Sequence, residues 1–207
     1  MGKSLLNRFL QHTRLPRGLA GRLVLRGMNC GHARMAEWGL SFVAWGADWR
    51  VLDVGCGGGA NLRRLLRLCP HGRVWGIDCS EESVAFARRV NHRELERRCF
   101  VEQGSAGALP YADAAFDAVT AFETVYFWPD LPQAFAEVKR VLRPGGLFLV
   151  CNEASDPSDT RWTSRIEGMR VYGEAELERL LSEAGFVRVE THRRGREGLC
   201  LLAGKPK

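Results

Sequence analysis

Short apolar runs alternate with longer amphipathic segments from residue 50 to the end of the chain. Apolar runs of this length, rich in Val, Leu, Ile and Phe, are typical of buried strands, and the amphipathic segments between them are typical of helices. The pattern predicts strands at 50–54, 73–78, 99–102, 116–122, 146–152, 186–191 and 199–204. It predicts helices at 60–68, 80–97, 131–142 and 174–184, with the charged run 88–98 as the solvated face of the second helix.

Strands that alternate with helices favour a parallel sheet with helices on both faces. Only residues 193–198 separate the core of the last two predicted strands, which is too few for a crossover helix, so they should form an antiparallel hairpin. The predicted fold is therefore α/β, with a seven-stranded, mostly parallel sheet and an antiparallel last strand.

Two segments lie outside this alternation. Before residue 50, apolar positions at helical spacing predict two helical pieces broken near 27–31. These positions are Leu15, Leu19, Leu23, Ala36, Leu40 and Val43. We predict a helical cap at 1–49, a main domain at 50–207, and an irregular lid at about 153–172, which follows the carboxyl end of the fifth strand.

The chain of 207 residues has a net charge of +6, and this charge is unevenly distributed. Residues 1–36 carry seven basic side chains and no acidic one, whereas the remainder has 23 basic and 24 acidic residues. A nearly neutral main domain argues against nucleic acid as a partner. The basic and apolar start, with Leu5, Leu6, Phe9 and Leu10 among Lys3, Arg8 and Arg14, predicts at most a weak contact with an anionic membrane surface.

The seven cysteines form no CxxC pair, which argues against a disulfide framework and against a zinc site, so we expect no metal. The cysteine pattern implies a reducing cytoplasm, and no segment has the length and apolarity of a signal sequence or a membrane span, so we expect a cytoplasmic protein. We also expect a monomer or a homodimer. An Arg-rich start without acidic residues also resembles an organelle transit peptide.

The first predicted strand leads into a glycine-rich turn and a helix, with the sequence VLDVGCGGGAN at 51–61. Gly55, Gly57 and Ala60 also fit a dinucleotide fingerprint, so the glycines alone do not identify the ligand. Asp53 stands two residues before the first glycine, where a carboxylate would repel a pyrophosphate. We therefore expect Asp53 to project toward a ligand with an ammonium group and no phosphate.

A second carboxylate, Asp78, ends the second predicted strand. In open α/β sheets, ligands bind across the carboxyl ends of neighbouring strands. We therefore expect Asp78 to share a crevice with Asp53 and to bind the two hydroxyls of a ribose.

Four segments in order, VLDVGCGGGANLRRLL, GIDCS, GSAGALPYADAAFDAV and VLRPGG, resemble the successive motifs of class I S-adenosylmethionine-dependent methyltransferases. The likeness is greatest to the small-molecule branch called methyltransferase type 11 or ubiquinone-biosynthesis-like, and it covers about 50–151. It implies a Rossmann-like methyltransferase fold, S-adenosylmethionine as cofactor, S-adenosylhomocysteine as product, and a small-molecule acceptor.

The resemblance also implies a set of cofactor-binding residues. The methionine portion would lie on Asp53, Gly55 and Gly57, the ribose on Asp78, and the adenine beside Cys79. We add Cys56, Asn61 and Phe122, which flank the same turn and strand end. The family commonly has an acidic or amide residue where this chain has Ser105, so we expect Ser105 and the backbone of Ala106 to provide weaker adenine contacts.

The segment after the fourth predicted strand should line the reacting end, because the resemblance puts the junction of cofactor and acceptor there. Candidate proton acceptors are Glu123, Tyr126 and His32, with His12 as a further histidine. Candidate acceptor-binding aromatic residues are Trp38, Trp128 and Tyr172. For Trp128, as for Tyr126, the alternative is packing in the core beneath the following helix, and for the segment with Trp38 it is a helix that merely covers the sheet edge.

Two other functions remain open from the sequence. The first is an RNA or protein methyltransferase that grips its substrate with the basic N-terminal arm, although Glu123-Thr124-Val125-Tyr126 stands where base-modifying enzymes have an NPPY-like tetrapeptide. The second is a catalytically silent protein that binds S-adenosylmethionine or lies on a membrane surface.

Overall fold

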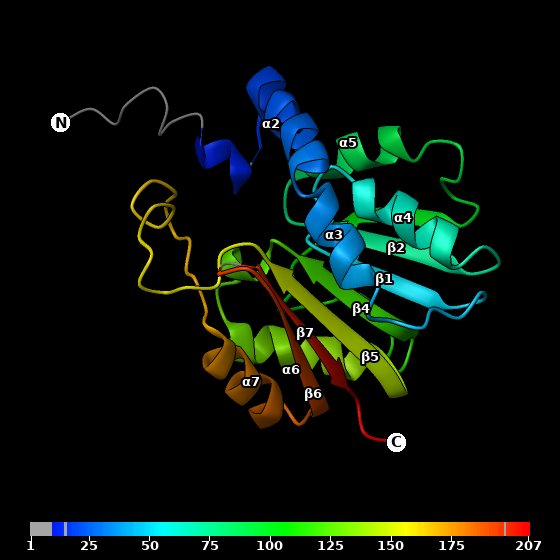
Figure 1. Ribbon diagram of the computed structural model, residues 1–207. Helices are drawn as coiled ribbons and strands as arrows, with labels where there is room; N and C mark the ends of the chain where they lie inside the picture. The colour runs from blue at the N-terminus through cyan, green and yellow to red at the C-terminus, as the bar shows by residue number, and fades with distance from the viewer. Residues whose placement is uncertain (1–9, 15, 197) are drawn as a thin grey trace.

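The computed structural model describes residues 10–14, 16–196 and 198–207, without the side chain of Leu19. Its centre is a seven-stranded sheet in the order β3-β2-β1-β4-β5-β7-β6 (Figure 1). The strands are β1 (Arg50–Val54), β2 (Arg73–Asp78), β3 (Cys99–Gln103), β4 (Phe116–Phe122), β5 (Leu142–Asn152), β6 (Val187–Arg194) and β7 (Gly198–Gly204).

Helices cover both faces of the sheet. They are α2 (Gly18–Gly31), α3 (Ala33–Leu40), α4 (Ala60–Leu68), α5 (Glu81–Val90), α6 (Leu131–Val141) and α7 (Glu174–Glu183), with short 3-10 turns η1 (Gln11–Thr13) and η2 (Val125–Phe127). In Figure 1, α3, α4 and α5 lie on one face and α6 and α7 on the other. All seven residues of β4 are buried, since this central strand is covered on both sides.

The sheet confirms the predicted fold class. Strands β1 to β5 pair in parallel, whereas β7 is antiparallel to both of its neighbours, β5 and β6. The strand order reverses between β1 and β4, so the segments that follow these two neighbouring strands lead in opposite directions and leave a crevice between them. Ligands of open α/β sheets bind at such a point.

Each face of the sheet has its own hydrophobic core. Phe135 of α6, Leu177 of α7 and Phe148 of β5 belong to one cluster, and Leu62 of α4 and Val74 of β2 belong to the other. All five side chains are fully buried. These two layers hold the strand ends rigidly in register, which is what a site built at the sheet edge requires.

The predicted helix at 80–97 is wrong in its length. Helix α5 ends at Val90, and the Nδ2 group of Asn91 then donates to the carbonyls of Gly59 (2.9 Å) and Ala87 (3.0 Å). Ser80 caps the start, since its Oγ accepts a hydrogen bond from the Ser83 N–H. The charged run 91–98 is therefore turn structure rather than a helix face, while strand β5 begins four residues earlier than predicted.

The two helical pieces predicted before residue 50 are present, and the break between them falls at His32. The predicted apolar stripe is only partly buried: Leu23 is 65% exposed, and Val24 and Leu25 are buried in its place. Met35, Ala36, Leu40 and Val43 belong to the same core cluster as residues of β1 and α4. Helix α3 is therefore packed as an integral part of the main core.

Candidate functional site

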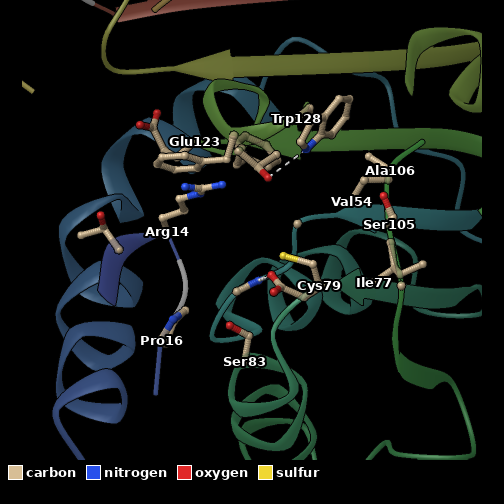
Figure 2. Close-up of a pocket in the computed structure, with 18 of the residues that line it drawn as sticks. Arg14, Pro16, Val54, Ile77, Cys79, Ser83, Ser105, Ala106, Glu123 and Trp128 are labelled. Carbon is tan, nitrogen blue, oxygen red and sulfur yellow. Dashed lines mark hydrogen bonds between the residues drawn. The ribbon is translucent and has the colours of Figure 1, made fainter. Parts of the chain in front are cut away.

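A first cavity of about 250 Å³ lies at the carboxyl ends of β1, β2 and β4. Its walls also include residues from the N-terminal segment and from η2. Figure 2 shows Arg14 entering from the N-terminal segment, with Glu123 and Trp128 on one side of the cavity and Cys79 and Ser83 across from them. The strand ends supply a fixed floor, and the N-terminal segment supplies a cover.

The glycine turn after β1 has the backbone geometry that only glycine adopts easily. Gly55 has φ of +76°, and a Cβ at this position would lie 2.0 Å from the Thr124 Oγ1. Gly57 has φ of +50°, but a Cβ there would meet open space. Gly57 therefore leaves its backbone accessible from the first cavity, as a ligand that approaches the main chain closely would need.

Asp78 lies where the sequence predicts it, in the wall of the first cavity at the end of β2. Its Oδ2 accepts a hydrogen bond from the Gly57 N–H (2.9 Å), and its Oδ1 accepts one from the Ser80 N–H (2.9 Å). Burial raises the pKa of Asp78, while the two amide donors oppose this shift. The carboxylate thus joins the glycine turn to the start of α5 and keeps acceptor capacity toward the cavity.

Asp53 is not where the sequence predicts it. Its carboxylate is 2% exposed, does not line the first cavity, and accepts a hydrogen bond from the Thr120 Oγ1 (2.6 Å). Burial raises the pKa of Asp53 to about 7. The sequence predicts that this side chain points to the ligand, but in the structure it lies within the sheet and contacts Thr120 of the neighbouring strand β4.

The other predicted cofactor residues divide into two groups. Cys79, Ser105, Ala106 and Phe122 line the first cavity, as does Trp128, which was predicted to contact the acceptor. Cys56 and Asn61 do not; they line a smaller hollow of about 60 Å³ on the other side of the glycine turn. This hollow shares Gly55, Gly57, Met28, Phe122 and Glu123 with the first cavity, so both open onto the same backbone.

A second cavity of about 250 Å³ adjoins the first. The two share four wall residues, Thr13, Met28, Glu123 and Phe127. Most of the remaining wall of the second cavity comes from the loop after β5, including Trp162, Ile166 and Met169. The predicted lid at 153–172 therefore does line a cavity next to the strand ends.

Four polar side chains meet in the second cavity, and we call them the polar cluster: His32, Glu123, Tyr126 and Glu153. His32 Nδ1 lies 3.0 Å from the Glu153 Oε2. Glu123 accepts from the Glu153 N–H (2.5 Å) and from the Tyr126 hydroxyl (3.1 Å), and the Ala154 N–H donates to the Tyr126 oxygen (2.9 Å). The three predicted proton acceptors are thus brought together.

The polar cluster has unusual protonation properties. Burial raises the pKa of Glu123 to about 7, although the nearby His32 opposes this shift. Burial lowers the pKa of His32, but its hydrogen bond to the Glu153 carboxylate and the charge of Glu123 outweigh this effect, so the net shift of the pKa is upward. Glu123 also has φ of +57°, a strained conformation for a residue other than glycine, and such strain is common at functional sites.

His32, Glu123 and Glu153 also have the residue types of a metal site. One potential ligand atom from each lies within 4.8 Å of the others. Their hydrogen bonds to one another and to the adjacent backbone already satisfy these atoms without an ion. The expectation that the protein uses no metal stays a prediction.

Three predicted site residues lie elsewhere and line neither cavity. Trp38 packs edge-on against Phe42, with ring centroids 5.1 Å apart. Tyr172 is 4% exposed in the core beneath the guanidinium of Arg170. His12 accepts a hydrogen bond from the Arg17 N–H through its Nδ1. Trp38 packs against one core cluster and Tyr172 is buried in the other, so neither is brought to the two cavities.

Sequence reasoning missed residues that the structure brings to the site. Glu153 follows the end of β5 directly, so the rule that identified Asp78 at a strand end could have found it. Arg14 and Met28 come from the N-terminal segment, and no local pattern signals that they line the cavities. Thr13 lines both cavities although it precedes the sheet by almost forty residues.

The N-terminal segment and the loop after β5 are joined to each other. The side-chain amide of Gln11 donates to the Arg165 carbonyl (2.7 Å) and accepts from the Glu167 N–H (3.0 Å). Arg14 donates to the Glu167 carbonyl (3.2 Å). In Figure 1 these two segments lie side by side beyond the carboxyl edge of the sheet, so together they form one cover over both cavities. Within the described residues, no helix has the length and apolar character to span a membrane.

Comparisons with known proteins agree with this fold. A family model described as a methyltransferase domain matches residues 52–150, the part that contains the glycine turn, Asp78 and the end of β4. This match covers slightly less than half of the chain, and it coincides with strands β1 to β5 of the sheet. Over this part the chain is similar to methyltransferases.

Among curated relatives, the chain is 43% identical over 101 residues to a fatty-acid O-methyltransferase of Mycolicibacterium smegmatis, covering 48% of this chain and 35% of the relative. It is 35% identical over 126 residues to a demethylmenaquinone methyltransferase of Symbiobacterium thermophilum, covering 58% of this chain and 50% of that one. The chain thus spans half or less of the length of these relatives.

Solved structures share the fold over most of the chain. A putative methyltransferase of Haloferax volcanii, in complex with the Trm112 methyltransferase activator, has a TM-score of 0.82 at 23% identity and covers 91% of this chain and 95% of that one. A SAM-dependent methyltransferase from Aquifex aeolicus has a TM-score of 0.74 at 22% identity, covering 88% and 97%. At these identities the likeness concerns the fold alone.

Proposed function

We propose that the protein transfers the methyl group of S-adenosylmethionine directly to a small-molecule acceptor. The observation that carries this proposal is the junction between the two cavities, which share Met28, Glu123 and Phe127. A sulfonium in the first cavity would present its methyl group to a nucleophile in the second across this junction. Direct displacement needs such an arrangement, because the two reacting atoms must approach in line.

The first cavity suits the parts of S-adenosylmethionine in order. We place the methionine portion along Gly55 and Gly57, with room toward the small hollow at Cys56 and Asn61. The ribose hydroxyls would donate to Asp78, and the adenine would lie between Cys79 and the Ser105 and Ala106 segment. Asp53 would act indirectly, by its contact with β4 rather than by a bond to the ammonium group.

The same cavities provide what methyl transfer requires physically. The sulfonium charge disperses in the transition state, so the reaction gains from alignment and from exclusion of water more than from new charged contacts. Phe127 and Trp128 offer apolar walls near the junction, and the joined cover over both cavities would exclude solvent. S-adenosylhomocysteine would leave when this cover opens.

The two alternative functions have less support. Of the basic residues in the N-terminal arm, Arg14 contributes to the wall of the first cavity and Arg22 pairs with Glu82 at 2.5 Å, so both are used within the molecule. Phosphate contact by this arm would have to come from the remaining basic residues. The apolar residues Leu5, Leu6 and Phe9, on which the membrane-surface alternative depends, lie outside the described residues.

Calorimetric titration with S-adenosylmethionine and S-adenosylhomocysteine tests the proposal. We expect both to bind the wild-type protein, and Asp78→Asn to weaken binding about tenfold, since a charged acceptor for the ribose is lost. Asp113→Asn is the matched control, because Asp113 lies on the surface in an ion pair with Arg140. Absence of binding to the wild type, or equal affinity in Asp78→Asn, would contradict the assignment. A labelled-methyl assay against metabolite fractions would then identify the acceptor.

A further inference from the structure

The second cavity has a charge pattern that restricts the acceptor. Its apolar walls are Met28, Phe127, Trp162, Ile166 and Met169, and one member of the polar cluster, Glu123, belongs to the wall shared with the first cavity. An acceptor in this cavity would have an apolar body, with its polar group directed to the junction where the methyl group arrives. This inference rests on the proposed function, which makes the second cavity the acceptor site.

The titratable groups that surround His32 in the second cavity come from three segments. Glu153 follows β5, Glu123 follows β4, and Tyr126 lies in η2. The one cationic side chain in the described wall besides His32 is Arg161, whose guanidinium is bound to Asp159 at 2.7 and 3.0 Å. When His32 is protonated, its positive charge is balanced by the negative charge of Glu153. Glu123 adds no positive charge, so the net charge of the polar cluster is not positive.

We propose that the second cavity accepts a hydroxyl or amine compound with an apolar body and excludes carboxylates, and that His32, oriented by Glu153, accepts the proton that the acceptor loses. An anionic acceptor would place a further negative group beside Glu153, and also beside Glu123 when that carboxyl is ionised, and like charges in one small cavity repel each other. A hydroxyl or an ammonium group instead finds acceptors for its protons. Glu153 is then a positioning residue and His32 a catalytic one.

The geometry assigns the two nitrogens of His32 different roles. Nδ1 carries the proton that is donated to Glu153, so Nε2 has the lone pair. In the reaction, the O–H or N–H bond of the acceptor breaks and its proton moves to Nε2. The freed lone pair forms the bond to the methyl carbon while the S–C bond breaks with its electrons on sulfur. The products are the methylated acceptor, neutral S-adenosylhomocysteine and an imidazolium held between Glu153 and Glu123.

Three matched ligands test the charge preference: 2-naphthol, 2-naphthylmethylamine and 2-naphthoate, each titrated into the protein saturated with S-adenosylhomocysteine. We expect naphthoate to bind about 100-fold more weakly than the better of the other two. In Glu123→Gln this gap should narrow about tenfold, because one carboxylate is neutralised. The ranking of the naphthol and the amine distinguishes oxygen from nitrogen methylation. Naphthoate binding as tightly as either of them, or no binding by any ligand, would overturn the proposal.

An NMR titration of His32 tests the role of Glu153. In Glu153→Gln the pKa of His32 should fall, because the hydrogen bond that raises it is weakened. Glu37→Gln is the matched control. Glu37 is an exposed carboxylate on α3, near the same helix break, and it pairs with Arg64 of α4 rather than with His32. An unchanged pKa of His32 in Glu153→Gln would overturn the assignment. Failure of the proposed function itself would appear separately, as a lack of S-adenosylhomocysteine binding.

Discussion

The two cavities of this molecule are built in different ways. The floor of the first cavity consists of strand ends and the glycine turn, so its shape depends on backbone conformation at Gly55 and Gly57. The second cavity consists mostly of side chains from the helix break at His32 and the loop after β5. A backbone-built cavity keeps its ligand as long as the fold is kept, whereas a cavity of loop side chains can change its ligand by substitution. The proposed cofactor site therefore follows from the fold, and the proposed acceptor site does not.

The largest effect should come from a bulky side chain in the glycine turn. Gly57→Trp should abolish measurable binding of S-adenosylhomocysteine, a loss of at least about 100-fold, because the side chain would fill the space through which the ligand reaches the backbone. Calorimetry provides the measurement. The control is Gly195→Trp, a glycine that also has positive φ and open space around its Cβ position but lies in the β6–β7 hairpin. Near wild-type affinity in Gly57→Trp would show that the first cavity is not the cofactor site.

The sequence predicts the first cavity well because its signals are local. The bounds of β1, β2, β4 and α4 are as predicted, and each of the three strands ends at or directly before a glycine or an acidic residue. Asp78 ends β2 and Ser105 follows β3, so the topology alone brings them to one edge of the sheet. Asp53 is the exception. It precedes the turn inside β1, and the side-chain hydroxyl of Thr120 on the neighbouring strand holds it there.

The second cavity could be predicted only in part because its contacts are distant in sequence. His32 and Glu153 are 121 positions apart, and nothing local indicates that they form a pair. Trp38 and Tyr172 lie in segments that the sequence predicts to cover the cleft, but both pack against the core through contacts that no local pattern indicates. The end of α5 could not be predicted for a similar reason. The Asn91 side chain, directly after the helix, donates to the carbonyl of Gly59, which is distant in sequence.

A second prediction separates the two aspartates of β1 and β2. Asp53→Asn should change the affinity for S-adenosylhomocysteine less than Asp78→Asn does, because Asp53 does not line the first cavity. Its main effect should be on stability. A buried carboxyl group whose pKa is raised from 3.8 to about 7 stabilises the folded state fully only below its unfolded value, and this contribution is lost as the pH rises through about 7.

The Asn variant lacks this titration. Relative to the wild type, Asp53→Asn should gain roughly 2 kcal/mol of unfolding free energy between pH 5 and pH 8. Urea unfolding at the two pH values measures the difference, and titrations of Glu123 and Asp78 largely cancel because they occur in both proteins. If the stability difference between Asp53→Asn and the wild type does not change with pH, the pKa of Asp53 is not raised. If Asp53→Asn loses much of its affinity for the cofactor, Asp53 contacts the ligand directly.

The smallest effect should come from the contact that joins the two parts of the cover. Gln11→Ala removes the two hydrogen bonds between the Gln11 side chain and the backbone of 165–167. In one of these bonds, the Glu167 N–H donates to the Gln11 side-chain oxygen. Exposed hydrogen bonds of this kind contribute about 1 kcal/mol, so protection of the Glu167 amide against hydrogen exchange should fall about fivefold. Gln133→Ala is the control, because Gln133 makes a comparable contact with the Gly107 carbonyl on another part of the surface.

In Gln11→Ala, the affinity for the methyl acceptor should decrease more than the affinity for the cofactor, since the loop after β5 supplies most of the second cavity and little of the first. Equal losses at both cavities would mean that the N-terminal segment, rather than the loop, is the part of the cover that moves.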